Sequence, residues 1–171
     1  MTTAAAPEEL AARFFEAFGR RDVDAMMSMV SEDITEDLAG FGVINGIEQD
    51  RTFLTALFES FPDLETQVTR TVAAGNVVAV EWRRRGTFTG RPWQGLPASG
   101  RPFNFRGCAL VEVDGNRIKR VDVYSDSAEF ARDIGVLPPE GSFGERVALA
   151  AFRVRARLRR AIRALAPSSG R

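Results

Sequence analysis

The sequence predicts an α+β domain in which helices cover one face of a curved antiparallel sheet. Helix-type apolar spacing dominates the chain as far as Phe61, and strand-type alternation dominates it from Leu64 to Ser125. Helices followed by a run of strands are typical of α+β proteins, in which the helices gather on one face of the sheet. A sheet of roughly four to six strands folded over three helices would form a cone with an apolar interior, and such interiors hold ligands.

An amphipathic helix is predicted from Pro7 to about Arg20. Proline suits the first helical position, because the N–H group that it lacks is not needed there. Leu10, Phe14 and Phe18 lie four residues apart, so one stripe of the helix is apolar. This stripe is expected to face the core.

A second short helix, capped by Asp22, is expected to run through Val30. A short strand, Ile34–Asp37, comes next. The third helix is predicted over Ile47–Phe61, where apolar residues recur at helical spacing, and Pro62 ends it.

Two hairpins supply most of the predicted sheet. The first joins Leu64–Val72 to Val77–Thr89. The second joins Phe103–Val113 to Arg117–Ser125 through Asp114-Gly115-Asn116. An Asp-Gly turn between two alternating runs is a strong hairpin signal.

A loop and a short helix complete the predicted domain. The segment Gly90–Pro102 holds three glycines and three prolines and is expected to be a loop. Trp93 in this loop is either a rim residue over a cavity or a ring packed on a nearby helix. Asp126 starts a capping-box pattern, and the helix that it caps should end near Ile134.

The charge of the chain is balanced overall but unevenly distributed. The 171 residues carry a formal net charge of zero, so no global field steers the chain toward nucleic acid, and we expect no nucleic-acid partner. Residues 142–171 hold eight arginines and one glutamate, a net charge of +7, which leaves −7 on residues 1–141.

The chain has no histidine and a single cysteine, Cys108. The usual zinc, copper and iron sites therefore have almost no ligands, and nucleophilic catalysis with a histidine base is impossible. Any chemistry must come from Asp, Glu, Tyr, Arg or Lys, and we expect no metal and no cofactor. The N-terminus lacks the pattern of a signal peptide, and no apolar run approaches the length of a membrane span. We therefore expect a cytoplasmic protein.

Several runs of the sequence resemble one known family. The runs RFFEAFGRRDVDAM, ITEDLAGFGVINGIEQDRTFL, GTFTGRPWQGLPASGRPFNFRG and RIKRVDVYSD are similar to SnoaL-like polyketide cyclases and their ketosteroid-isomerase-like relatives. These proteins belong to the cystatin-like superfamily named after nuclear transport factor 2. The resemblance covers about Pro7 to Gly135 and implies the cone-shaped fold. It specifies the chemistry less closely, because this fold hosts isomerases, cyclases, epoxide hydrolases and non-catalytic binders.

The resemblance also assigns roles to individual positions. Asp37 stands at the position of the ketosteroid isomerase general base. Ketosteroid isomerase stabilises its oxyanion with two donors, a tyrosine and a protonated aspartate. Phe14 and Ala109 stand at these two positions here, so efficient ketosteroid isomerisation is not expected. Asp126 matches the acid/base aspartate of the cyclases. The histidine that accompanies it there is replaced by Cys108.

The predicted function is cofactor-free acid/base chemistry, of the cyclase or isomerase type, on a hydrophobic polyketide- or steroid-like molecule. The alternatives are a non-catalytic small-molecule-binding or interaction module of the same fold, and an enzyme that opens epoxides. The predicted catalytic residues are Asp37, Asp126 and Tyr124. The predicted substrate-binding residues are Arg106, Cys108, Trp82, Phe14, Phe18, Phe58 and Trp93. Asp37 and Asp126 also have structural explanations, a turn and a helix cap respectively.

The chain is divided at about residue 140. Residues 1–140 form the predicted domain, and residues 141–171 form a basic amphipathic helical extension with a short disordered tail. Six apolar residues between Ser142 and Leu165 recur at helical spacing: Val147, Ala151, Val154, Leu158, Ile162 and Leu165. We expect this seam to dock on the acidic body of the same or a neighbouring subunit of a homo-oligomer, a dimer or tetramer, and not on a membrane, for which it lacks Trp and Tyr anchors.

Overall fold

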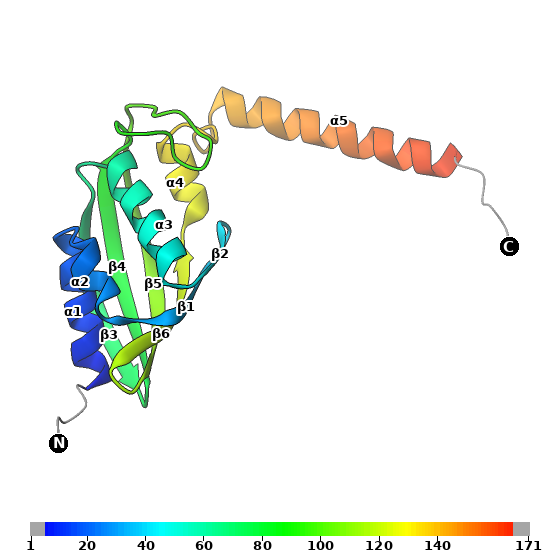
Figure 1. Ribbon diagram of the computed structural model, residues 1–171. Coiled ribbons are helices and arrows are strands. Elements are labelled where there is room, and N and C mark those ends of the chain that lie inside the picture. Colours follow the sequence, from blue (N-terminus) through cyan, green and yellow to red (C-terminus); the bar gives the residue numbers. More distant parts are fainter. Residues whose placement is uncertain (1–5, 166–171) are drawn as a thin grey trace, which may run out of the picture.

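The computed structural model describes residues 6–165, and a six-stranded sheet with the order β2-β1-β6-β5-β4-β3 forms its centre. Three N-terminal helices lie against one face of this curved, open sheet (Figure 1). The helices are α1 (Pro7–Gly19), α2 (Val23–Met27) and α3 (Ile47–Ser60). The strands are β1 (Val30–Leu38), β2 (Gly42–Asn45), β3 (Glu65–Ala74), β4 (Val77–Thr87), β5 (Pro102–Asp114) and β6 (Arg117–Ser125). The predicted α+β fold is confirmed.

The beginning of the sheet differs from the prediction. Asp22 caps α2 as expected, because its carboxylate accepts a hydrogen bond from the Ala25 N–H at 2.9 Å. However, the helix ends at Met27, and Val30 already belongs to β1. The reason is tertiary: Val30 pairs with Ile118 of β6, in the single parallel ladder of the described sheet, and both side chains are buried.

The second hairpin forms as predicted, with one irregularity that changes which residues share a face. The register between β5 and β6 shifts at Glu112/Val113, so that Val113 pairs with Ile118 while Glu112 pairs with Arg120. Lys119 is the extra residue. Consequently Ile118 is buried in the core, whereas unbroken alternation along the strand would place it on the same face as the exposed Tyr124.

The sheet buries one face only. Residues that alternate along β4 and β5, such as Val78, Val80 and Val111, point into the core beside the phenylalanines of α1. The opposite face carries Val72 and Tyr124, which are both more than half exposed. The interior of the cone is therefore the only side that the three helices close.

Two further helices follow the sheet. The short α4 (Ser127–Asp133) returns to the core through Phe130. The 23-residue α5 (Phe143–Leu165) confirms the predicted C-terminal helix and leads away from the sheet and its helices (Figure 1). Within residues 6–165, no helix is both long enough and apolar enough to cross a membrane.

Candidate functional site

The sheet and helices enclose a cavity of about 100 Å³ inside the cone. Its wall is apolar and largely aromatic, apart from the side chains of Glu36, Arg84 and Ser125. Four of the predicted binding residues line it: Phe14, Phe18, Trp82 and Trp93. A mostly apolar enclosure with a few polar groups is typical of a small-molecule site.

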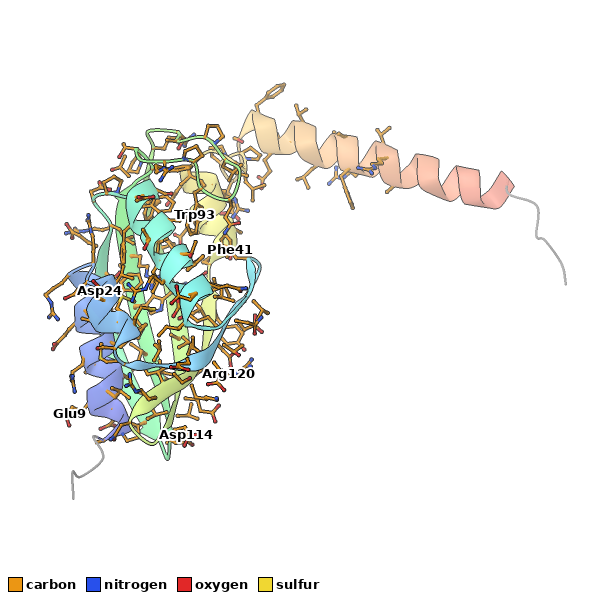
Figure 2. All side chains as sticks on the ribbon, viewed as in Figure 1. Glu9, Asp24, Phe41, Trp93, Asp114 and Arg120 are labelled. Atoms are coloured by element: carbon orange, nitrogen blue, oxygen red, sulfur yellow. The ribbon has the colours of Figure 1, made fainter. Side chains whose placement is uncertain are left out.

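The loop between β4 and β5 closes one end of the cavity through Trp93. This ring is 6% exposed and packs against Phe53 and Phe61, with centroids 5.2 and 5.7 Å away. Phe41, in the turn between β1 and β2, also lines the cavity but is 44% exposed. Both residues lie in the upper half of the domain (Figure 2). Phe41 therefore brings part of the cavity lining to the surface at this turn.

Glu36 is the carboxyl group that faces the cavity. Ile34, Glu36 and Leu38 alternate along β1, and Ile34 is fully buried, so Glu36 takes an inward position and is only 5% exposed. Burial, and to a smaller extent the nearby Asp50 carboxylate, raises the pKa of Glu36 to about 8, while the Arg84 cation acts in the opposite direction. Glu36 therefore holds its proton near neutral pH.

A second acid, Asp50, lies in α3 on the side that packs against β1. Its side chain is fully buried, and neither carboxylate oxygen has a hydrogen-bond partner in the described part of the chain. Burial raises the pKa of Asp50 to about 6. Asp50 does not line the cavity. It acts on the site through the charge that it places near Glu36.

Arg84 provides the positive charge of the cavity wall. It lies two residues after Trp82 in β4, on the same face, and its guanidinium is stacked 4.3 Å from the Phe18 ring centroid and 4.1 Å from that of Trp82. Burial lowers the pKa of Arg84 to about 10, an effect that Glu36 opposes. Arg84 thus stays cationic at neutral pH, held between two aromatic rings.

Four other predicted site residues come together on the opposite face of the sheet. Arg106, Cys108, Tyr124 and Asp126 line a shallow groove of about 490 Å³ there. Asp126 is confirmed as the cap of α4, since it accepts a hydrogen bond from the Glu129 N–H at 3.0 Å. The sequence predicted these four residues for one site together with Asp37 and the aromatic residues, but they do not line the interior cavity.

Asp37 and Phe58 also lie outside the cavity lining. The Asp37 carboxylate faces away from the interior, 3.9 Å from the Arg120 guanidinium. Asp37 and Asp126 therefore do not share an enclosed site. Phe58 is partly buried and packs edge-on against Phe18, with the ring centroids 5.1 Å apart, so it supports the wall from behind.

The sequence analysis did not predict Glu36, Asp50 or Arg84 as site residues, although the spacing of Arg84 and Asp50 indicates a buried position for both. Arg84 follows Trp82 by two residues, which puts both on one face of a strand. Asp50 precedes Phe53, Leu54 and Leu57 at spacings of three, four and seven, so it belongs to the apolar stripe of its helix. A charged residue on a face that is otherwise apolar indicates a candidate functional group, because charged side chains are rarely buried.

Comparisons with known proteins agree with this fold. The model of the SnoaL-like polyketide cyclase family matches residues 9–134. No functionally curated protein matches the chain. A candidate SnoaL-like polyketide cyclase from Jannaschia sp. CCS1 has 23% identity and a TM-score of 0.72, covering 81% of this chain and 97% of its own.

Two further solved structures extend the comparison. IdmH, a candidate polyketide cyclase from Streptomyces antibioticus, has 25% identity and a TM-score of 0.65, covering 77% of this chain and 99% of its own. A hypothetical protein with a ketosteroid isomerase-like fold from Catenulispora acidiphila has 18% identity and a TM-score of 0.65, covering 77% of this chain and 98% of its own. The matched family region, residues 9–134, contains the six strands and ends after α4, so that α5 lies outside it.

Proposed function

The chain belongs to the SnoaL-like polyketide cyclase family, and on that basis we propose that it is a cofactor-free acid/base enzyme of the cyclase or isomerase type. Its substrate would be a hydrophobic, polyketide-like carbonyl compound bound in the interior cavity. One observation carries the proposal: the buried carboxyl of Glu36 faces an aromatic cavity with a pKa of about 8. A group that titrates near neutral pH can both give and take a proton.

The chemistry follows from the protonation state of Glu36. As the protonated acid, Glu36 donates its proton to a substrate carbonyl oxygen, and the carboxylate that forms then removes a proton from the carbon next to that carbonyl. One proton leaves Glu36 and one returns, so the side chain ends the cycle unchanged. Arg84 stabilises the carboxylate that Glu36 carries between the two proton transfers.

This proposal moves the acid/base role from the residues predicted first. Asp37 and Asp126, which the sequence predicts as catalytic residues, do not line the interior cavity, so they are not its acid/base pair. The catalytic roles of Asp37, Asp126 and Tyr124 stay predictions. The alternative of a non-catalytic binder is favoured by the aromatic wall, which would hold an apolar ligand without any reaction.

Proton exchange next to a carbonyl tests the proposal without knowledge of the natural substrate. The probe is 2-tetralone in deuterated buffer, followed by proton NMR. The wild-type protein should accelerate exchange, and Glu36→Gln, which keeps the size of the side chain, should lose most of this acceleration. Glu32→Gln is the matched control, because Glu32 is an exposed residue of the same strand and does not line the cavity. Equal rates for wild type and Glu36→Gln would rule out Glu36 as the acid/base group.

A further inference from the structure

Two N–H donors in the cavity wall have no partner among the described residues: the indole Nε1 of Trp82 and the guanidinium Nε of Arg84. Trp82 is 1% exposed. Both side chains line the cavity and project from the same face of β4. Buried donors without partners are rare in proteins, and each one calls for an explanation such as a bound group. We refer to Trp82 and Arg84 as the donor pair.

The donor pair is held rigidly. The Trp82 ring lies over Gly107 of β5, its cross-strand neighbour, where an added Cβ would come within 2.4 Å of Trp82 Cζ2. The Arg84 guanidinium stacks on the Trp82 ring and on that of Phe18. A preorganised pair of donors binds an acceptor at a smaller entropic cost than mobile side chains would.

The charges around the donor pair favour an anion. Arg84 forms no ion pair within the described residues. The acid that shares the cavity with it, Glu36, holds its proton near neutral pH, and the second acid, Asp50, does not line the cavity. The polar part of the wall therefore offers donors and a cation to a ligand, but no ionised carboxylate. A cation in an apolar surrounding is stabilised by an anion placed against it.

We propose that the cavity binds a hydrophobic carboxylic acid, whose carboxylate sits against the Arg84 guanidinium and accepts the Trp82 N–H. The planar guanidinium of arginine matches the two oxygens of a carboxylate, which distinguishes this ligand class from alcohols or neutral ketones. The remainder of the ligand would lie against the aromatic wall. The inference rests on the proposed function only in assigning the ligand to the interior cavity, and it adds a chemical class to that ligand.

A pair of isosteric probes tests this directly. 4-Methylbenzoate and 4-methylbenzamide differ in charge but hardly in shape, and their affinities can be measured by calorimetry at neutral pH. Both tryptophans of the chain line the cavity, so their fluorescence gives a second readout of binding. The wild-type protein should bind the benzoate roughly tenfold to a hundredfold more tightly than the benzamide, the range expected for charged hydrogen bonds.

Variants of the donor pair identify the origin of that preference. Arg84→Met should remove most of the preference, and Trp82→Phe should reduce it by roughly threefold to tenfold, because the amide oxygen of the benzamide can also accept the indole N–H and only the difference between a charged and a neutral acceptor is lost. Arg83→Met is the matched control, because Arg83 is the neighbouring residue of β4, exposed on the other face. It should leave the preference unchanged. If Arg84→Met does not fold, as judged by thermal melting, the wild-type and Trp82→Phe results decide.

The outcomes separate this inference from the proposed function. Equal affinity of the wild type for both probes, no binding of either, or a preference that persists in the folded donor-pair variants would overturn the inference. These titrations involve no turnover. A carboxylate preference that depends on Arg84, combined with proton exchange that does not depend on Glu36, would refute the proposed acid/base role and leave the binding inference standing.

Discussion

Glu36 and Asp37 are consecutive residues of β1, yet their carboxyl groups lie on opposite faces of the sheet. Glu36 is 5% exposed and faces the interior cavity, whereas the Asp37 side chain is 48% exposed and approaches Arg120. Alternation along a strand is sufficient to explain this difference. If the acid is assigned to Glu36 instead of Asp37, it is therefore a buried, protonated group instead of an exposed member of an ion pair.

The raised pKa of Glu36 should make the protein less stable as the pH rises. The folded state keeps the proton up to a pH of about 8, whereas the unfolded chain releases it near the ordinary value of 4.5. Between these limits the folded state binds more protons, so the free energy of unfolding falls with increasing pH, by at most about 1.4 kcal/mol per pH unit. Glu36→Gln should flatten this slope in chemical denaturation measured across that range. Identical slopes in the two proteins would contradict the assignment.

Gly107 should tolerate no side chain, because Trp82 occupies the space above it. An alanine Cβ there would lie 2.4 Å from Trp82 Cζ2 and 2.6 Å from the Tyr124 carbonyl oxygen. Gly107→Ala should therefore destabilise the fold by about 1–3 kcal/mol, the usual effect of overpacking, and should shift the tryptophan fluorescence. Gly19→Ala is the control, since a Cβ at Gly19 meets nothing within 4 Å. Equal stability of the two variants would show that the ring does not rest on Gly107.

Asp126 allows a structural role to be separated from a catalytic one. Asp126→Ala should lower the free energy of unfolding by about 0.5–2 kcal/mol, because the bond from Glu129 N–H is lost, while Asp126→Asn should lower it little. Thermal or chemical denaturation measures both. The catalytic role predicted from the sequence requires the Asn variant to lose turnover while its stability is kept. Equal destabilisation by Ala and Asn would argue against the cap.

The apolar side of α5 has no partner within the described domain. Val147 and Val154, two members of the predicted seam, are 51% and 55% exposed, and Phe152 is 69% exposed. The side chains of Leu158, Ile162 and Leu165 lie outside the described residues, as does the predicted disordered tail at 166–171. Since α5 packs on none of the other described helices or strands, docking on the same body is not observed. A neighbouring subunit is the partner that we expect.

Truncation after Pro139 tests this expectation. The shortened protein should change its oligomeric state in light-scattering chromatography, because the +7 segment would no longer meet the −7 body of a neighbour. Full-length protein should bind anionic vesicles negligibly. An unchanged oligomeric state, together with vesicle binding that truncation abolishes, would instead favour a membrane surface.

The sequence predicted the order of the elements well because hydrophobic periodicity and turn residues are local signals. The predicted limits of the last strand of the second hairpin, Arg117–Ser125, agree with those of β6. The short β2 was missed, because Gly42–Asn45 has too few alternating residues to stand out. The parallel pairing of β1 with β6 is a long-range contact that no local pattern encodes.

The candidate site was harder to predict for two physical reasons. First, the family resemblance attracted attention to Asp37, although the alternation from the buried Ile34 favours Glu36 as the inward residue. Second, Asp50 and Glu36 meet only after α3 packs against β1, so their effect on each other is a tertiary property. By contrast, Trp82 and Phe14 do line the cavity, because large apolar residues on a predicted core face are also the ones that line an interior cavity. Their role in substrate binding stays a prediction.

The central claim is that Glu36 is a cavity acid that keeps its proton near neutral pH. Carbon-13 NMR of the side-chain carboxyls, with Glu36→Gln to assign the signal, measures this directly in the folded protein. We expect the Glu36 carboxyl to titrate at a pH of about 8, and to titrate at a lower pH in Asp50→Asn, because the Asp50 charge raises its pKa. Titration of Glu36 near 4.5, the ordinary value, would contradict the account.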